Sequence, residues 1–203
     1  MSNIITIYSF ADVDRSGKVR WAACELGWEI KEERIALGEH KAEEYLELNP
    51  YAMVPTAVID QETWIDSNAI CILLAERDPQ ERLIPANAPE RAIFWQSLGL
   101  AVSTLELPVV NYFLASRGFV DQGWKDLVEE GITARMRTYA GNLPENGYLC
   151  GSFSIADICA GYVLRIAVQA GILVYEGKLA NYLDLLRARP AAIESRVFDS
   201  LET

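Results

Sequence analysis

Asp66 and Ser67 stand at the start of a predicted helix, because they directly precede an apolar segment with helical spacing. Ile70, Leu73 and Leu74 share one face of that segment. The first turn of a helix has free N–H groups at the positive end of the helix dipole, and it binds carboxylates and phosphates. The same two residues also form an ordinary N-cap, so a purely structural role stays open.

The cysteines indicate neither a redox pair nor a metal centre. Cys24, Cys71, Cys150 and Cys159 show neither a CxxC motif nor the ligand spacing of a zinc site, and the chain has one histidine, His40. Because all four cysteines lie in apolar, helix-like segments, we expect buried, reduced thiols in a reducing compartment. We expect no metal site.

Composition and charge restrict the class of protein further. The 203 residues are 51% hydrophobic and 23% charged, which is typical of a globular chain, and 18 basic against 29 acidic residues give a net charge of −11. Such an acidic chain is a poor partner for nucleic acid. Residues 1–10 lack the pattern of a signal peptide, and the apolar stretch Ile158–Tyr175 contains Arg165 and Gln169, as a buried helix does. We expect a cytoplasmic protein without a membrane partner.

The first part of the chain alternates strand-like and helix-like segments in the order βαβαββα. This order predicts a mixed sheet covered by helices. Asp60-Gln61-Glu62 has the spacing of a hairpin connection. The predicted strands are Ile4–Ser9, Glu29–Ile35, Thr56–Ile59 and Thr63–Ile65, and the predicted helices are Ser16–Gly27, Lys41–Leu48 and Asp66–Asp78.

The second part of the chain has helical periodicity throughout. Pro79, Pro85 and Pro89 exclude a continuous helix between the two parts, so we expect domains at 1–78 and 89–203 joined by a linker at 79–88. Ser154 and Asp157 have the spacing of a capping box at a helix start, with Phe153 and Ile158 at the hydrophobic staple positions. Helices are predicted near 89–117, 122–143, 154–170 and 177–189.

This layout and four stretches of sequence resemble the cytosolic glutathione transferases, with motifs similar to those of the zeta and phi classes. The stretches are Lys18–Trp21, Gly38–Lys41 with Tyr45–Pro55, Ile65–Ile70, and Gly151–Asp157. The resemblance implies a thioredoxin-like N-terminal domain, a C-terminal helical bundle and a homodimer, in which Tyr51 lies in the loop that often inserts an aromatic side chain into the partner subunit. It also implies glutathione as co-substrate, with no metal.

The resemblance further implies a set of glutathione contacts. The Val54–Pro55 bond would be cis, with the Val54 backbone paired antiparallel with the cysteinyl backbone of the ligand. Ser67 would hold the γ-glutamyl carboxylate, Asp66 the neighbouring ammonium, and His40 with Lys41 the glycyl carboxylate. Taken without the motif, Lys41 is a solvated lysine, His40 a loop residue and Val54–Pro55 a turn into a strand. The full set is His40, Lys41, Val54, Pro55, Asp66 and Ser67.

The chain departs from the family at the position that activates the thiol. Without gaps, the catalytic serine of zeta-like members falls on Val13, which has no donor, and Asp12 and Asp14 beside it carry charge that opposes a thiolate. Three hypotheses remain: Ser16 supplies the hydroxyl, the backbone N–H groups stabilise the thiolate with help from Arg15, or the thiol is not activated. We favour Ser16 with the local backbone.

Tyr8 and Ser9 are weaker candidates, because neighbouring strand residues point to opposite faces of a sheet. The resulting hypothesis is an enzyme that transfers glutathione to a small apolar electrophile. The alternative is a non-catalytic glutathione-binding or protein-interaction module on the same fold.

Overall fold

The structure is a computed structural model that describes residues 3–119 and 121–201. It separates into two compact units. The first comprises the residues up to Leu83 together with Arg189–Ser200, and the second comprises Ile84–Ala188 with the residues from Leu201 onward. Each unit has its own core.

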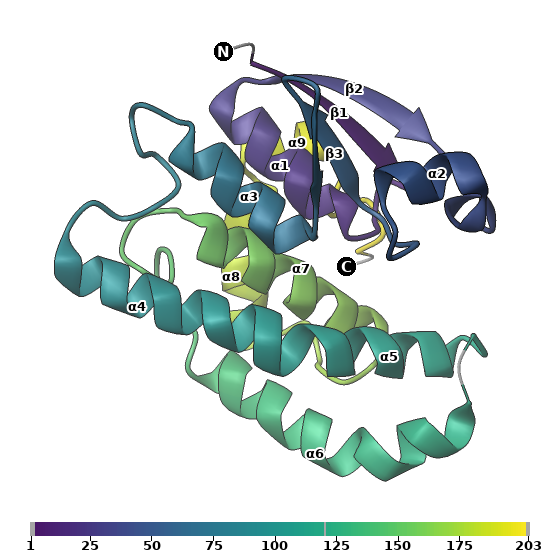
Figure 1. Cartoon of the computed structure of the whole chain (residues 1–203). Coiled ribbons are helices and arrows are strands. Elements are labelled where there is room, and N and C mark those ends of the chain that lie inside the picture. The colour runs from purple at the N-terminus through teal and green to yellow at the C-terminus, as the bar shows by residue number, and fades with distance from the viewer. Residues whose placement is uncertain (1–2, 120, 202–203) are drawn as a thin grey trace. The chain divides into compact units, whose positions relative to one another are not determined.

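The first unit is built on a four-stranded mixed sheet of order β2-β1-β3-β4 (Figure 1). β1 is parallel to β2 and antiparallel to β3, and β3 is antiparallel to β4. This arrangement confirms the predicted βαβαββα order, to which the structure adds a short 3-10 helix. The elements are β1 (Ile4–Ser9), α1 (Ser16–Leu26), β2 (Glu29–Arg34), η1 (Glu39–Lys41), α2 (Glu43–Leu48), β3 (Thr56–Ile59), β4 (Glu62–Ile65) and α3 (Ser67–Glu76).

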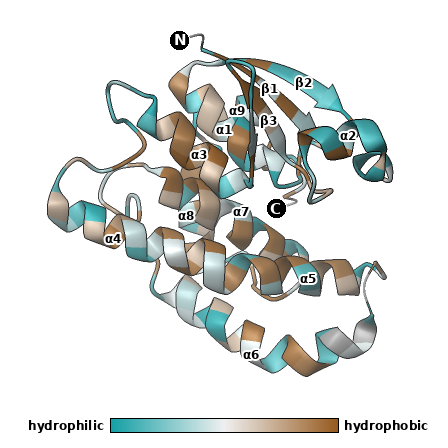
Figure 2. Ribbon diagram, viewed as in Figure 1, coloured by the Kyte–Doolittle hydropathy of each residue, from teal (hydrophilic) through white to brown (hydrophobic). Residues whose placement is uncertain are grey.

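Alternating side chains of the central strands form the core of the first unit. Ile5 and Ile7 of β1 and Ala57 and Ile59 of β3 are fully buried. β2 lies at the edge of the sheet and is hydrophilic and largely exposed (Figure 2). The β3–β4 hairpin was predicted, but Glu62 belongs to β4, where it pairs with Ile59, so the turn is shorter than expected.

The C-terminal helix α9 (Pro190–Ser195) packs against α1 of the first unit. The sequence analysis instead assigned every residue from 89 onward to the helical domain. The C-terminal segment belongs to the first unit because it packs closely there: a Cβ added at Gly17 would lie only 2.9 Å from the Val197 side chain. In addition, the rings of Trp21 and Phe198 meet edge to face at 5.3 Å.

The second unit is helical, as predicted. Residues 88–116 form one long helix, which passes through a π-helical segment just before Pro108. Proline has no N–H to donate and its ring disturbs the preceding turn, which accounts for the irregularity. The elements are α4 (Ala88–Gly99), η2 (Leu100–Glu106), α5 (Leu107–Ser116), α6 (Gln122–Gly141), α7 (Ile155–Gln169) and α8 (Gly177–Arg187).

α7 is the buried central helix of the second unit, and the predicted capping box begins it. The Ser154 N–H donates to the Asp157 carboxylate at 2.9 Å. Phe153 and Ile158 are both buried, as a hydrophobic staple requires. The Tyr182 hydroxyl also donates to Asp157, at 2.7 Å, which the local pattern did not predict.

Among the described residues, one helix is long and apolar enough to cross a membrane. It is Ala88–Ser116, with 29 residues and a mean hydropathy of 1.5 in its most apolar window, of which 39% is buried. The sequence analysis singled out Ile158–Tyr175 instead. Core helices of soluble proteins meet the same criterion of length and composition, so this helix is weak evidence of a membrane span.

Candidate functional site

Strand register brings three predicted regions together at one end of the sheet. Thr56, the first residue of β3, lies opposite Tyr8 in β1 and Ile65 in β4. The loop that follows β1, the turn that precedes β3 and the start of α3 therefore meet at this end. They contain Val13 and Ser16, Val54–Pro55, and Asp66–Ser67, respectively.

The turn before β3 is held by two buried side chains. Tyr45 and Asn49 both donate to the carbonyl oxygen of Met53, at 2.7 and 2.8 Å, and both also contact the Thr56 hydroxyl. Burial raises the pKa of Tyr45, which keeps its hydroxyl a donor at neutral pH. The expected cis bond at Val54–Pro55 is present. The sequence analysis quoted Tyr45 and Asn49 within a motif but assigned them no role.

The turn exposes an unpaired piece of backbone at Val54. Among the described residues, none hydrogen-bonds the Val54 N–H or C=O, whereas Thr56 two residues later is in the β3 ladder. An unpaired residue beside a sheet offers a donor and an acceptor to one strand-like segment of a ligand.

α3 begins with a capped and unusually shaped turn. Asp66 has a positive φ of 68°, and its Oδ1 accepts the N–H groups of Asn68 and Ala69, each at 2.9 Å. The structural N-cap role of Asp66 is therefore present. Ser67 is almost fully buried, and its hydroxyl makes no hydrogen bond to a described residue. We call the Val54 backbone and Ser67 the open edge.

His40 and Lys41 lie in η1, and His40 is the closer of the two to the β1–α1 loop (residues 10–15). The His40 ring meets the Phe10 ring edge to face at 5.0 Å. Its Nδ1 accepts the Gly38 N–H at 3.1 Å, so in the neutral ring Nε2 carries the hydrogen and remains a donor. Lys41 is exposed and forms no ion pair within the described part of the chain.

The β1–α1 loop is closed by Asp14. Asp14 Oδ2 accepts the N–H groups of Phe10 and Ala11, at 2.8 and 3.0 Å. Its Oδ1 accepts the Ser16 N–H at 2.7 Å and also the Ser16 hydroxyl. The carboxylate of Asp14 therefore acts as an internal cap of the loop, and four donors offset its charge.

Ser16 does not fit the catalytic role that the sequence analysis favoured. The residue is fully buried, its hydroxyl donates to Asp14, and it accepts a hydrogen bond from Arg20 Nη1 at 2.8 Å. A hydroxyl held on both sides in the interior has no exposed face for a sulfur atom. The sequence could not show this, because it depends on how the loop folds over Arg20.

The other hydroxyls near the loop differ in access. Ser9 is fully buried and donates to Glu32 at 2.5 Å, whereas Tyr8 is partly exposed, with its ring 6.0 Å from that of Tyr45. Val13 is partly exposed in the loop and supplies no hydroxyl. The Asp12 carboxylate pairs with Arg34 and, at 2.8 Å, with Arg196.

The cysteines are not available as nucleophiles. All four are free thiols; Cys71, Cys150 and Cys159 are buried, and Cys24 is partly exposed. Burial raises the pKa of Cys24 to about 12 and that of Cys150 to about 11, which keeps both protonated at neutral pH. In the described part of the chain, no three His, Cys, Asp or Glu side chains are grouped to hold a metal ion.

The first unit has a thioredoxin-like fold with an open edge, and the second unit is helical. The protein therefore belongs to the class that combines a thioredoxin-like domain with a helical domain. A family model described as "Glutathione S-transferase, N-terminal domain" matches residues 15–77. Probable maleylacetoacetate isomerase 2 of Drosophila melanogaster is 37% identical over 160 residues, which cover 75% of this chain and 70% of that protein. The chain belongs to the cytosolic glutathione transferase family.

Further relatives support the same family and fold. Glutathione S-transferase 1 of Dianthus caryophyllus is 29% identical over 144 residues, which cover 67% of this chain but only 65% of that protein. The crystal structure of a glutathione transferase homolog from sulfitobacter with bound glutathione superposes with a TM-score of 0.82 at 19% identity. That superposition covers 98% of this chain and 99% of the other.

Proposed function

We propose that this protein binds glutathione, activates its thiol and transfers it to a small apolar electrophile. The observation that carries the proposal is the open edge, where the Val54 backbone and the Ser67 hydroxyl have no partner among the described residues. The family membership and the glutathione bound by the sulfitobacter homolog support glutathione as the ligand.

The open edge suits the middle and one end of the tripeptide. The Val54 N–H and C=O would pair with the cysteinyl backbone, in the manner of a one-residue strand addition. Ser67, at the positive end of the α3 dipole, would donate hydrogen bonds to the γ-glutamyl carboxylate. The Asp66 Oδ1 atom caps the helix, so the other carboxylate oxygen would face the ligand ammonium.

The other end of the tripeptide is assigned to η1. His40 Nε2 and the Lys41 ammonium would hold the glycyl carboxylate, since neither donor has a partner among the described residues. These contacts are local, which reconciles the binding of an anionic ligand with a net charge of −11.

Family membership also supports a proposal for the assembly and location. We propose a cytoplasmic homodimer without a nucleic-acid or membrane partner. Tyr51 supports the dimer, because 66% of this aromatic residue is exposed beside the open edge, where a second subunit would cover it. Sedimentation of the purified protein tests the dimer directly.

Calorimetric titration with glutathione, paired with conjugation of a generic aryl halide, tests the main proposal. Maleylacetoacetate is the second substrate to assay, because it is named in the Drosophila relative. Saturable binding with turnover of either substrate is the expected result. No binding at millimolar glutathione would refute the proposal.

A non-catalytic glutathione-binding module is the second candidate function. The specific observation in its favour is that Val13 lacks a hydroxyl and Ser16 is buried. Tight binding of glutathione without lowering of its thiol pKa would establish this alternative over the enzyme.

A further inference from the structure

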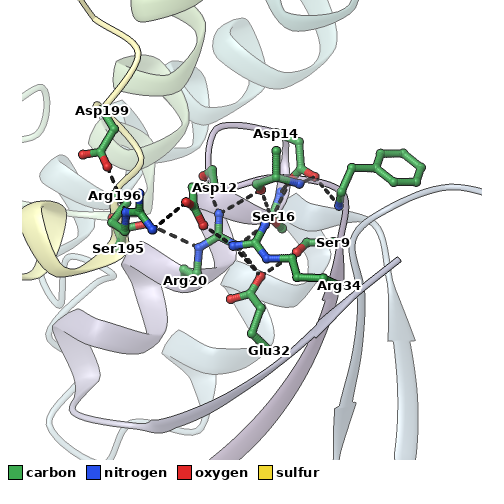
Figure 3. A network of polar contacts seen from close by, with 12 residues as sticks. Ser9, Asp12, Asp14, Ser16, Arg20, Glu32, Arg34, Ser195, Arg196 and Asp199 are labelled. Atoms are coloured by element: carbon green, nitrogen blue, oxygen red, sulfur yellow. Dashed lines mark hydrogen bonds and ion pairs between the residues drawn. The ribbon is translucent and has the colours of Figure 1, made fainter. Parts of the chain in front are cut away.

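Arg20 lies beneath the β1–α1 loop and holds it from the inside (Figure 3). Its Nη2 donates to the carbonyl oxygens of Ala11, at 3.3 Å, and of Asp12. Its Nη1 donates to Glu32 at 2.6 Å, and its Nε to the Ser195 carbonyl oxygen at 3.3 Å. Only 5% of Arg20 is exposed, so the loop covers a fixed, charged anchor.

This anchor fixes the direction of two successive peptide groups. In a trans peptide, the C=O of one residue and the N–H of the next point in opposite directions. Because the Ala11 and Asp12 carbonyl groups point at the buried guanidinium, the N–H groups of Asp12 and Val13 point away from it. The Asp12 N–H has no partner among the described residues, whereas Asp14 takes the N–H groups of Phe10 and Ala11.

The acidic side chains of the loop are kept from opposing a nearby anion. The Asp12 carboxylate pairs with Arg34 and Arg196, and the Asp14 carboxylate accepts four donors of the loop itself (Figure 3). The loop therefore presents oriented amide dipoles with its own negative charges offset. Preorganised N–H groups of this kind stabilise charge that develops beside them.

We propose that Arg20 is a positioning residue that holds the Asp12 N–H group toward the glutathione sulfur and so stabilises the thiolate without a side-chain hydroxyl. The inference rests on the proposed function, and it replaces Ser16 as the source of activation. The thiol releases its proton to solvent, and the sulfur keeps the electron pair and accepts a hydrogen bond from the Asp12 N–H. Arg20 itself does not touch the sulfur.

Arg20→Lys tests the proposal, because lysine keeps the charge but is a point donor and cannot hold both carbonyl groups in the planar geometry of a guanidinium. The measurement is the thiolate absorbance of bound glutathione as a function of pH. We expect the thiol pKa to rise by about one unit, so the thiolate fraction falls about tenfold at a pH below that pKa. Affinity for S-methylglutathione, which has no thiol, is expected to stay within about twofold of wild type.

Arg77→Gln is the matched control. Arg77 pairs with Asp60 at 3.0 Å in the same unit, away from the β1–α1 loop, and its loss should leave the thiol pKa unchanged. Glu32→Gln is a second test variant, since it weakens the partner of Arg20 while preserving its shape. It is expected to raise the thiol pKa by less than Arg20→Lys does.

The outcomes separate this inference from the proposed function. Wild-type protein that binds neither glutathione nor S-methylglutathione refutes the proposed function. Wild-type protein that binds both, with a thiol pKa that a folded Arg20→Lys variant does not change, overturns the role of Arg20. If Arg20→Lys does not fold, an unchanged thiol pKa in Glu32→Gln overturns it instead.

Discussion

The open edge and the β1–α1 loop lie at the same end of the sheet, but they use their polar groups in opposite ways. At the open edge, the Val54 backbone and the Ser67 hydroxyl have no partner among the described residues. In the loop, the side chains of Asp12, Asp14 and Ser16 are all engaged by neighbouring donors or acceptors.

This difference separates binding from activation. The open edge has donors and acceptors that no described residue pairs, so it gains hydrogen bonds when a ligand arrives. The loop has already satisfied its side chains, so what remains for chemistry is the direction of its peptide groups. Mutations in the two regions should therefore affect different measurements.

The largest expected effect comes from removing the anchor of the loop. Arg20 and Arg34 both contact Glu32, but 6% of the Arg20 side chain is exposed against 41% for Arg34. Arg20→Ala removes the closest cation from the partly buried Glu32 carboxylate and a charged donor from two loop carbonyl groups, and we expect a loss of about 3–5 kcal/mol in the free energy of unfolding. Urea denaturation measures it. Arg34→Ala should cost less than about 1 kcal/mol, and equal losses would contradict the comparison.

The second effect is on affinity at the open edge. Ser67→Ala removes a hydroxyl that is expected to bond a charged carboxylate, worth about 1.5–3 kcal/mol, so the glutathione Kd should rise about ten- to hundredfold. Because the Ser67 hydroxyl bonds no described residue, stability should change by less than about 0.5 kcal/mol. Calorimetry and urea denaturation give the two values. An unchanged Kd would remove Ser67 from the site.

The third expected effect, at Ser16, is the reverse of that at Ser67: stability changes, whereas glutathione affinity does not. Ser16→Ala breaks hydrogen bonds to Asp14 and Arg20, so the unfolding free energy should fall by about 1 kcal/mol. Glutathione affinity and turnover should stay at the wild-type value, because the buried hydroxyl does not reach the ligand. A specific loss of turnover in stable Ser16→Ala protein would restore the hydroxyl as the thiol activator.

Ser16 also shows what sequence alone can and cannot predict. Features set by neighbouring residues were predicted correctly, such as the Ser154 and Asp157 capping box and the β3–β4 hairpin. The burial and hydrogen bonds of the Ser16 hydroxyl depend on a loop that folds back over Arg20, and no local sequence pattern predicts the conformation of that loop. The sequence analysis considered the loop backbone as an alternative, but the direction of its carbonyl groups needed coordinates.

The C-terminal segment illustrates the same limit. Residues 177–189 were predicted as a helix from their periodicity, and α8 confirms it. Periodicity shows that a helix has an apolar face, but it does not show which core receives that face. The packing of α9 on α1, and of Val197 against Gly17, is a contact across most of the chain length that a local pattern cannot reveal.

The smallest expected effect is at Lys41, on the rim of the proposed site. Lys41 is exposed, and ion pairs in solvent contribute little because water and salt screen them. Lys41→Met should therefore weaken glutathione binding only about two- to fivefold at low salt, and the difference from wild type should shrink as salt is raised. Calorimetry at two ionic strengths measures this, with Lys31→Met on β2 as the control cation. A loss of affinity as large as that of Ser67→Ala, and independent of salt, would contradict this expectation. It would mean that Lys41 holds the glycyl carboxylate in a desolvated contact, so the glutathione site would include η1 as fully as the open edge.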